Sequence, residues 1–516
     1  ARGGWKRRMV DSVCGSASSC RRREMSDRWK RRPLDPITLM GLWIGVIGRR
    51  FCYDDGMKCG LALFLAAVVT GMLSLVACTG SGRENLNPKV APIPRKTVVW
   101  LTEEGVDAET AERLAAVGVD QLVVRRGTIR LSGAAPVVQL LRSPTVEGPI
   151  PAAVALEVHG LGSSDHDRAA AAVWAVLEAD FGSRLPTELI LDLSEIGDAA
   201  SGFVSELAQH SGLAVVPVLT VSQAGTEAGR AVAKAAHRCI VPVFGSQDDD
   251  LRGLGEMKSQ PLAVRLAAIK DLGIRVRLAA ALRPKCEPDV GGWAEDLDAL
   301  TAEDAAEIKR TSTLDRSFLT RSPLTWAGRS FGVGQTIAVA WVDAARLGLF
   351  LTECHRAILP EMEGWDLVSL PPEGPNLGLD REELIGYLGG QGPAPTVEVD
   401  VQRSRQNLTV RITNPSVFRS AITSFSNWVQ IELESGALVA TSRGSFDRVV
   451  LGALEDGEWR ANPLGGPNAV RFVETYLAPG EVLTTGTIRL PTSRSRVRVR
   501  WQIQLSDGSS VTGAVE

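Results

Sequence analysis

From Lys96 onward, apolar runs of strand length alternate with segments of helix length, and this alternation restricts the fold more than any other feature of the sequence. Three junctions between a helix and the next strand have the same form, with one glycine between them: Gly118, Gly212 and Gly273. A glycine in this place adopts the left-handed conformation that ends a helix, so the strand can begin at once. The sequence therefore predicts a series of repeated βα units.

The expected strands are mostly continuous apolar runs, which is typical of a parallel sheet covered on both faces. They are residues 97–101, 119–124, 152–158, 188–193, 213–220, 239–244 and 274–282, with a closing strand at 365–371. At least seven units in series favour an α/β fold, a (β/α)₈ TIM-like barrel at residues 96–390, over a Rossmann sheet. No Gly-x-Gly-x-x-Gly motif follows an early strand, so we expect no dinucleotide or other cofactor.

The pattern is less regular before the closing strand, where we expect a helix at 302–310 and a strand turning into a helix at 337–350. After Pro395 the apolar period becomes two, as in Val397, Val399 and Val401. Turn sequences such as Asn414-Pro415 separate these short strands. The pattern predicts a C-terminal antiparallel β-sandwich domain at residues 394–516.

Met57–Cys78 has the form of an export signal. One lysine precedes an uncharged apolar run that ends in Leu75-Val76-Ala77-Cys78, and small residues follow. Such a segment with small residues at its end is typical of a secretory signal. Leu-Val-Ala-Cys resembles the lipobox of bacterial lipoproteins, which implies that residues 57–77 are a signal peptide and that Cys78 is lipidated. The alternative is a transmembrane helix, because the run is nearly long enough to span a bilayer.

The segments on either side of this signal follow from it. Residues 1–56 contain arginine clusters among Ser, Gly and Cys without helix or strand periodicity. We expect them to be a disordered, non-native extension ahead of a true start at Met57, because a lipoprotein signal must lie at the N-terminus. The alternative is a basic arm for nucleic acid or anionic lipid. Residues 78–95 are polar and proline-containing, and we expect a tether.

The formal net charge of −3 combines a basic stretch at 1–56 with an acidic remainder. An acidic body lacks the basic footprint of a nucleic-acid-binding protein, so we expect no nucleic-acid partner. Beyond Cys78, only Cys239, Cys286 and Cys354 remain, too far apart for a zinc pattern. We expect no bound metal and three buried thiols, with a disulfide between two of them as the alternative.

The chain from Met57 to the C-terminus resembles uncharacterised bacterial lipoproteins with a TIM-barrel-like, glycoside-hydrolase-like domain of unknown function. The residues that carry the resemblance are 188–192, 215–220 and the closing segment 364–371. In that family the fourth strand usually carries two aspartates around an aromatic residue. Asp192 matches the first of them, whereas Leu193 and Ser194 replace the others. The resemblance implies a bacterial cell-envelope location, lipid-anchored on the periplasmic or extracellular face, and no known reaction.

The site of a (β/α)₈ barrel lies at the carboxyl ends of its strands. Glycoside hydrolysis needs two facing carboxyl groups, and Glu157 and Asp192 end adjacent expected strands, so we predict that they form a catalytic pair. We assign substrate binding to other residues at strand ends, namely Glu104, His159, Arg283 and Asp366. The alternative roles are structural, because carboxylates at strand ends also cap helices and pair with arginines.

These features lead to two functional hypotheses. The first is an exported barrel that binds or processes a cell-envelope or extracellular carbohydrate, held to the membrane by its N-terminal lipid. The second is a non-catalytic envelope lipoprotein that uses the same scaffold to bind a partner or a glycan. The fold alone does not choose between them.

Overall fold

The computed structural model describes residues 96–516, with gaps of which the longest are 245–266 and 288–299. The predictions for residues 1–56, 57–77 and 78–95, including lipidation of Cys78, lie outside the described residues. Of the predicted site residues, Glu104 lies outside them as well.

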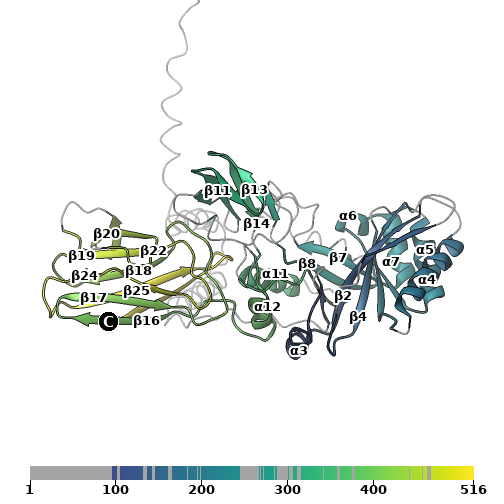
Figure 1. Ribbon diagram of the computed structural model, residues 1–516, viewed down its shortest axis with the longest axis horizontal. Helices are drawn as coiled ribbons and strands as arrows, with labels where there is room; N and C mark the ends of the chain where they lie inside the picture. The colour runs from purple at the N-terminus through teal and green to yellow at the C-terminus, as the bar shows by residue number, and fades with distance from the viewer. Residues whose placement is uncertain are drawn as a thin grey trace, which may run out of the picture. The chain divides into compact units, whose positions relative to one another are not determined.

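Eight parallel strands close into a barrel, as the sequence predicted (Figure 1). The first strand, β1, pairs on one side with the second and on the other with the last, which completes the ring. In their order around the barrel the strands are β1 (Thr97–Trp100), β15 (Met362–Val368), β8 (Arg275–Ala281), β7 (Arg238–Phe244), β6 (Ala214–Val218), β5 (Glu188–Leu193), β4 (Ala152–His159) and β2 (Gln121–Arg130). A short antiparallel strand, β3 (Val137–Leu140), adds to β2 from outside the ring, and the sequence did not predict it.

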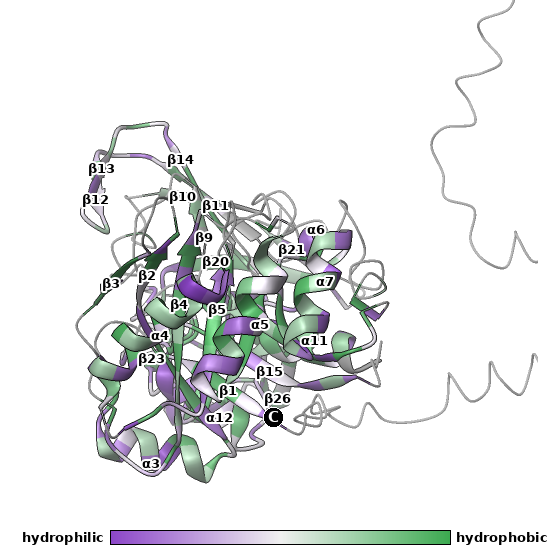
Figure 2. Ribbon diagram, turned by 90° about the vertical axis from the view of Figure 1, so that its right-hand side faces the viewer, coloured by the Kyte–Doolittle hydropathy of each residue, from purple (hydrophilic) through white to green (hydrophobic). Residues whose placement is uncertain are grey.

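Both faces of the barrel strands are buried, which explains why their sequences are continuously apolar. Side chains such as Val98, Ile190 and Ile240 fill the interior, whereas Val99, Leu191 and Val241 pack outward under the helices. Figure 2 shows the apolar strands within a layer of helices of mixed hydropathy. These helices are α3 (Ala108–Ala116), α4 (His166–Phe181), α5 (Ala199–Ser211), α6 (Val221–Ala224), α7 (Glu227–Ala236), α11 (Ala344–Arg356) and α12 (Arg381–Leu388).

The predicted helix–glycine–strand junctions at Gly118 and Gly212 are confirmed, whereas most of the helix expected before Gly273 lies outside the described residues. Gly118, Gly212 and Gly273 have φ values of +88°, +65° and +62°, in the region that side chains disfavour. The first helix is capped at its start, because the Asp107 side chain accepts a hydrogen bond from the Thr110 backbone N–H. These local signals set where each helix ends and each strand begins.

An antiparallel insertion lies between β8 and β15, and here the prediction was wrong in part. Residues 306–310, expected to be helical, form a strand that pairs with 315–320. The expected strand-to-helix turn at 337–350 is confirmed by β14 and α11. One sheet of the insertion has the order β10 (Ala306–Arg310), β11 (Asp315–Thr320), β14 (Thr336–Ala340) and β9 (Lys285–Glu287), and a hairpin consists of β12 (Leu324–Trp326) and β13 (Arg329–Phe331).

The C-terminal region is the predicted antiparallel β-sandwich. Its two sheets enclose a core to which Val410, Ile431 and Phe472 contribute. The smaller sheet contains β16 (Glu398–Ser404), β17 (Asn407–Thr413), β19 (Val439–Ala440), β23 (Val482–Thr484) and β24 (Ile488–Arg489). The larger sheet contains β18 (Asn427–Leu433), β20 (Arg448–Glu455), β21 (Glu458–Ala461), β22 (Ala469–Glu474), β25 (Val497–Gln504) and β26 (Ser510–Val515).

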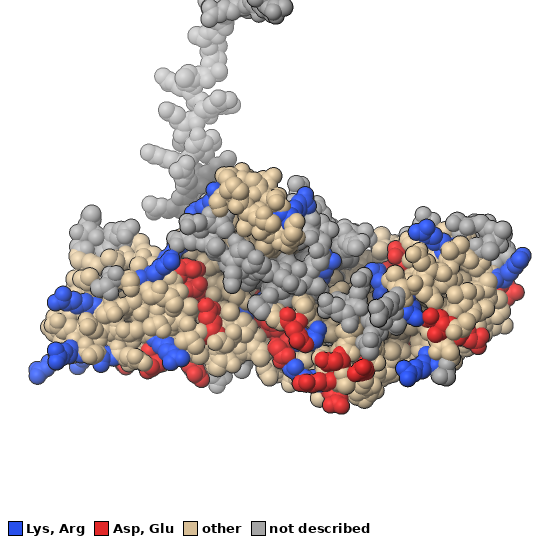
Figure 3. Space-filling model, in the orientation of Figure 1, with Lys and Arg blue, Asp and Glu red and all other residues tan. Residues whose placement is uncertain are grey.

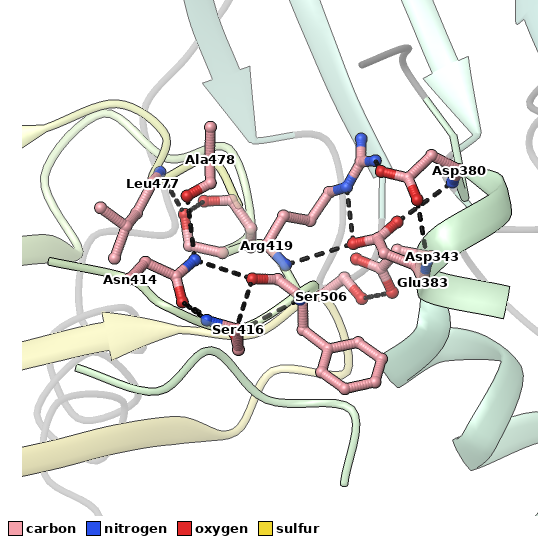
Figure 4. Close-up of polar contacts among 12 residues, drawn as sticks. Asp343, Asp380, Glu383, Asn414, Ser416, Arg419, Leu477, Ala478 and Ser506 are labelled. Atoms are coloured by element: carbon pink, nitrogen blue, oxygen red, sulfur yellow. Dashed lines mark hydrogen bonds and ion pairs between the residues drawn. The ribbon is translucent and has the colours of Figure 1, made fainter. Parts of the chain in front are cut away.

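A buried charge cluster links α12 to the segment that precedes β18 (Figure 4). Arg419 donates to Glu383 Oε1 at 2.7 Å and to Asp380 Oδ2 at 2.8 Å. Glu383 also closes a capping box with Asp380 at the start of α12. Burial raises the pKa of Glu383 to about 7, although Arg419 opposes the rise.

Candidate active site

The predicted carboxyl pair meets at the mouth of the barrel. Glu157 on β4 and Asp192 on β5 are directly opposite each other in the register of these two neighbouring strands. Ala155 and Ile190, two residues earlier on each strand, belong to the barrel interior. Since side chains alternate along a strand, Glu157 and Asp192 lie on the same interior face, at the carboxyl ends of their strands.

Each carboxylate of the pair has a basic side chain beside it. Arg125 Nη2 lies 3.6 Å from Asp192 Oδ2, and His159 Nε2 lies 3.2 Å from Glu157 Oε1. The side chains of Asp192 and Glu157 are each 43% exposed, and that of Arg125 is 60% exposed. The side chains of both pairs are therefore accessible to a ligand from solvent. The sequence had singled out three of them, whereas Arg125 was missed.

The environment of Asp192 favours its protonated form. Burial raises the pKa of its carboxyl group, the positive charge of Arg125 opposes this rise, and the negative charge of Glu157 adds to it. Two carboxyl groups that share one place commonly differ in protonation, because ionising both is costly. A pair of this kind can divide the work of general acid and general base.

Asp366 does not belong to the surface of the mouth. It has no exposed area and lies inside the barrel, where Trp100 Nε1 donates to its Oδ1 at 2.8 Å and Arg277 Nε lies 3.1 Å from its Oδ2. The predicted role in substrate binding therefore does not fit, because a ligand at the mouth cannot contact this carboxylate. Trp100 closes the interior above it and is 8% exposed.

A cluster of charged side chains fills the opposite end of the barrel. Glu188, at the start of β5, accepts hydrogen bonds from Arg277 Nη1 at 2.9 Å, from Lys96 Nζ at 3.0 Å and from Arg238 Nη1 at 3.1 Å. Burial alone raises the pKa of Glu188, but these three cations together lower it below its ordinary value. We call Glu188, Lys96, Arg238 and Arg277 the floor cluster.

Arg283 follows β8 at the same end of the barrel as the carboxyl pair and is half-buried. Arg283 therefore lies at the end of a barrel strand, as the sequence predicted.

A second group of polar side chains lies on the outer helices. Asp167, Glu206 and His210 bring one ligand atom each within 4.8 Å of one another, and His210 Nε2 lies 2.7 Å from Asp167 Oδ1. An exposed ion pair with one further carboxylate accounts for this arrangement without a metal. In the part of the chain that the structure describes, no helix has the length and apolar character to cross a membrane. The face shown in Figure 3 carries both signs of charge, with acidic side chains gathered over α3 and α12.

No family model matches this chain, and neither does any curated protein. Among solved structures, the chain is similar to the spore cortex-lytic enzyme SleL of Bacillus cereus, with 8% identity over 58% of this chain and 74% of that chain and a TM-score of 0.36. It is also similar to SleL of Bacillus megaterium, with 11% identity over 54% and 71% and a TM-score of 0.32. A GH30 endoxylanase of Clostridium papyrosolvens gives 8% identity over 78% and 98% and a TM-score of 0.25. All three matches have identities of 11% or less and TM-scores below 0.5, so they assign no function to this chain.

Proposed function

We propose that the mouth of the barrel binds and hydrolyses a carbohydrate, with Asp192 as general acid and Glu157 as nucleophile or base. The observation that carries this proposal is the register of β4 and β5, which sets the two carboxyl groups side by side on the interior face. Parallel strands are spaced by about 4.8 Å. Glycosidases that retain configuration separate their carboxyl groups by about 5–5.5 Å, and inverting enzymes by about 6.5–9.5 Å. The strand spacing favours the retaining arrangement.

The surroundings of the pair support this division of roles. The raised pKa of Asp192 suits a group that delivers a proton to a leaving oxygen. Glu157 lies against His159, whose Nε2 is 3.2 Å from its Oε1. Arg125 supplies guanidinium donors that can hold a ligand hydroxyl group.

The test is a glycan-binding screen of residues 96–516, followed by a reducing-sugar assay on each glycan that binds. Asp192→Asn and Glu157→Gln are expected to retain folding and binding and to lose hydrolysis. The control is Asp400→Asn, because Asp400 is exposed on β16 of the sandwich. Hydrolysis by both site variants at the wild-type rate would refute the catalytic assignment.

The second candidate function is non-catalytic binding by the same mouth. It is favoured by the pairing of Asp192 with Arg125 and by the contact of Glu157 with His159, because such pairs also occur in structural networks. In this case the wild type binds glycans but cleaves none. Asp192→Asn and Glu157→Gln then change only the affinity for the glycan.

We further propose that the chain is a lipoprotein, anchored through Cys78 in the bacterial cell envelope. The support is the segment Leu75-Val76-Ala77-Cys78 after an uncharged apolar run. Metabolic labelling with a palmitate analogue tests this proposal, and it should mark the wild type and leave Cys78→Ala unlabelled.

A further inference from the structure

The strand that presents Arg125 is irregular at this position. β2 and β4 pair regularly from Leu122 to Arg125, and the pairing then resumes at Gly127, so that Arg126 is an extra residue in β2. Such a β-bulge changes the direction of side chains and occurs preferentially beside active sites. Gly127 has a φ of +152°, and a Cβ atom on it would lie 2.1 Å from the Gln139 carbonyl oxygen. Only glycine therefore fits the bulge.

The bulge separates two adjacent arginines. Arg125 follows Gln121 and Val123 in the interior alternation and extends to Asp192. Arg126 lies on the outside, where its guanidinium contacts the Leu141 carbonyl oxygen and forms an ion pair with Asp180 on α4. One strand thus offers the same residue type in two consecutive positions, one at the mouth and one on the exterior.

We propose that Arg125 is a positioning residue of the mouth, which holds the Asp192 carboxylate in place and controls whether that carboxyl group carries a proton. This role rests on the carbohydrate site proposed above. This role is separate from folding stability, because the Arg125 side chain is 60% exposed and its Nη2 lies as far as 3.6 Å from Asp192 Oδ2. Exposed ion pairs of this kind contribute little to folding.

Among the residues that the structure describes, the other groups around Asp192 leave this control to Arg125. β4 presents Glu157, which favours the protonated form of Asp192, and His159, which opposes it when charged. β6, on the other side of β5, presents Val218, which carries no charge. Arg125 is the permanent positive charge among them, since guanidinium groups stay protonated throughout the working range of proteins. A ligand that draws the Arg125 guanidinium away would therefore favour proton uptake by Asp192.

The experiment measures the ionisation of Asp192 directly. The full chain is labelled with aspartate carrying ¹³C at the side-chain carboxyl, and its ¹³C NMR spectrum is recorded as a function of pH. The signal of Asp192 is identified by its absence in Asp192→Asn. In Arg125→Gln the titration midpoint of this signal is expected to rise by about one pH unit, at the low end of the effect of a nearby opposite charge. Arg126→Gln, the matched control, is expected to leave it unchanged.

One further variant keeps the proposal testable. Arg125→Lys retains the charge and is expected to give a midpoint near that of the wild type, which also covers the case in which Arg125→Gln does not fold. An unchanged midpoint in Arg125→Gln, or an equal rise in Arg126→Gln, would overturn the proposal. Because the readout is ionisation, a failure to find any glycan ligand refutes the proposed function without altering this result. With a cleaved substrate, the alkaline limb of kcat/KM in Arg125→Gln should move to higher pH by the same interval.

Discussion

The floor cluster allows a sharp test of how charge stabilises the barrel. Glu188→Gln keeps the shape of the side chain and removes its negative charge, which leaves Lys96, Arg238 and Arg277 around a neutral group. The Glu188 side chain is 6% exposed and that of Arg277 is 2% exposed. Breaking a buried ion pair by neutralising one partner costs about 3–5 kcal/mol, because the remaining charge stays buried without compensation.

This loss is large enough to measure by thermal unfolding. A change of 1 kcal/mol shifts Tm by about 2–4 °C in domains of 150–250 residues. The barrel is longer than this, so we use the lower end and expect Tm to fall by roughly 6–10 °C at neutral pH. Circular dichroism in the far ultraviolet follows the transition. The matched control is Glu382→Gln on α12, whose exposed pair with Arg113 contributes about 0–1 kcal/mol.

The pH dependence identifies the cause of the loss. The pKa of Glu188 is lower in the folded protein than its ordinary value of 4.5. Its charge therefore contributes stability that is fully present above pH 4.5 and is lost as the pH falls through the folded pKa. The Tm difference between the wild type and Glu188→Gln should accordingly be constant above pH 4.5 and shrink below it. A difference that persists unchanged in acid, or one no larger than that of Glu382→Gln, would refute the reasoning.

Four further predictions follow from other residues. Burial raises the pKa of Glu383 to about 7, so its protonated form contributes stability that is lost as the pH rises from 4.5 through 7. Glu383→Gln should flatten the profile of Tm against pH in this range. Asp192→Asn should fold and lose glycan hydrolysis, whereas a variant that only melts several degrees lower indicates a structural pair. The Cys78→Ala variant should be absent from the membrane fraction or should keep its signal segment. A variant that fractionates and migrates like the wild type would contradict lipidation. Ellman's reagent should not react with the folded 96–516 fragment, because Cys239, Cys286 and Cys354 are each buried. Burial also raises the pKa of the Cys239 thiol to about 12. Rapid reaction of the native protein would disprove this.

The barrel was predictable because its signals are local. Continuous apolar runs and the glycines at 118, 212 and 273 determine where strands and helices alternate, and neither depends on distant contacts. The strand at 306–310 was not predictable in the same way. In Ala306-Glu307-Ile308-Lys309-Arg310 the apolar residues alternate with polar ones, but the run is short, and its pairing with residues 315–320 is what makes it a strand.

The candidate site was predictable to the level of strand ends. Glu157 and Asp192 could be placed together because they end neighbouring parallel strands. Arg125 was missed because the expected strand ended at residue 124, whereas β2 continues to Arg130 and carries Arg125 on its interior face, opposite Ala155 of β4. Asp366 was assigned to substrate binding because the sequence of a strand does not show which of its interior polar residues pairs with a buried arginine, here Arg277.

The place of β1 between β2 and β15 also determines how the chain can assemble. Trp100 and Asp366 are 266 positions apart, and their strands have to meet before the ring exists. Contacts between such distant segments slow folding, because the loop between them has to be closed first. Until β15 has been synthesised, one edge of β1 and one edge of β8 remain open, and open strand edges pair readily with other chains. The ring therefore cannot close on the nascent chain until residues 362–368 have emerged from the ribosome.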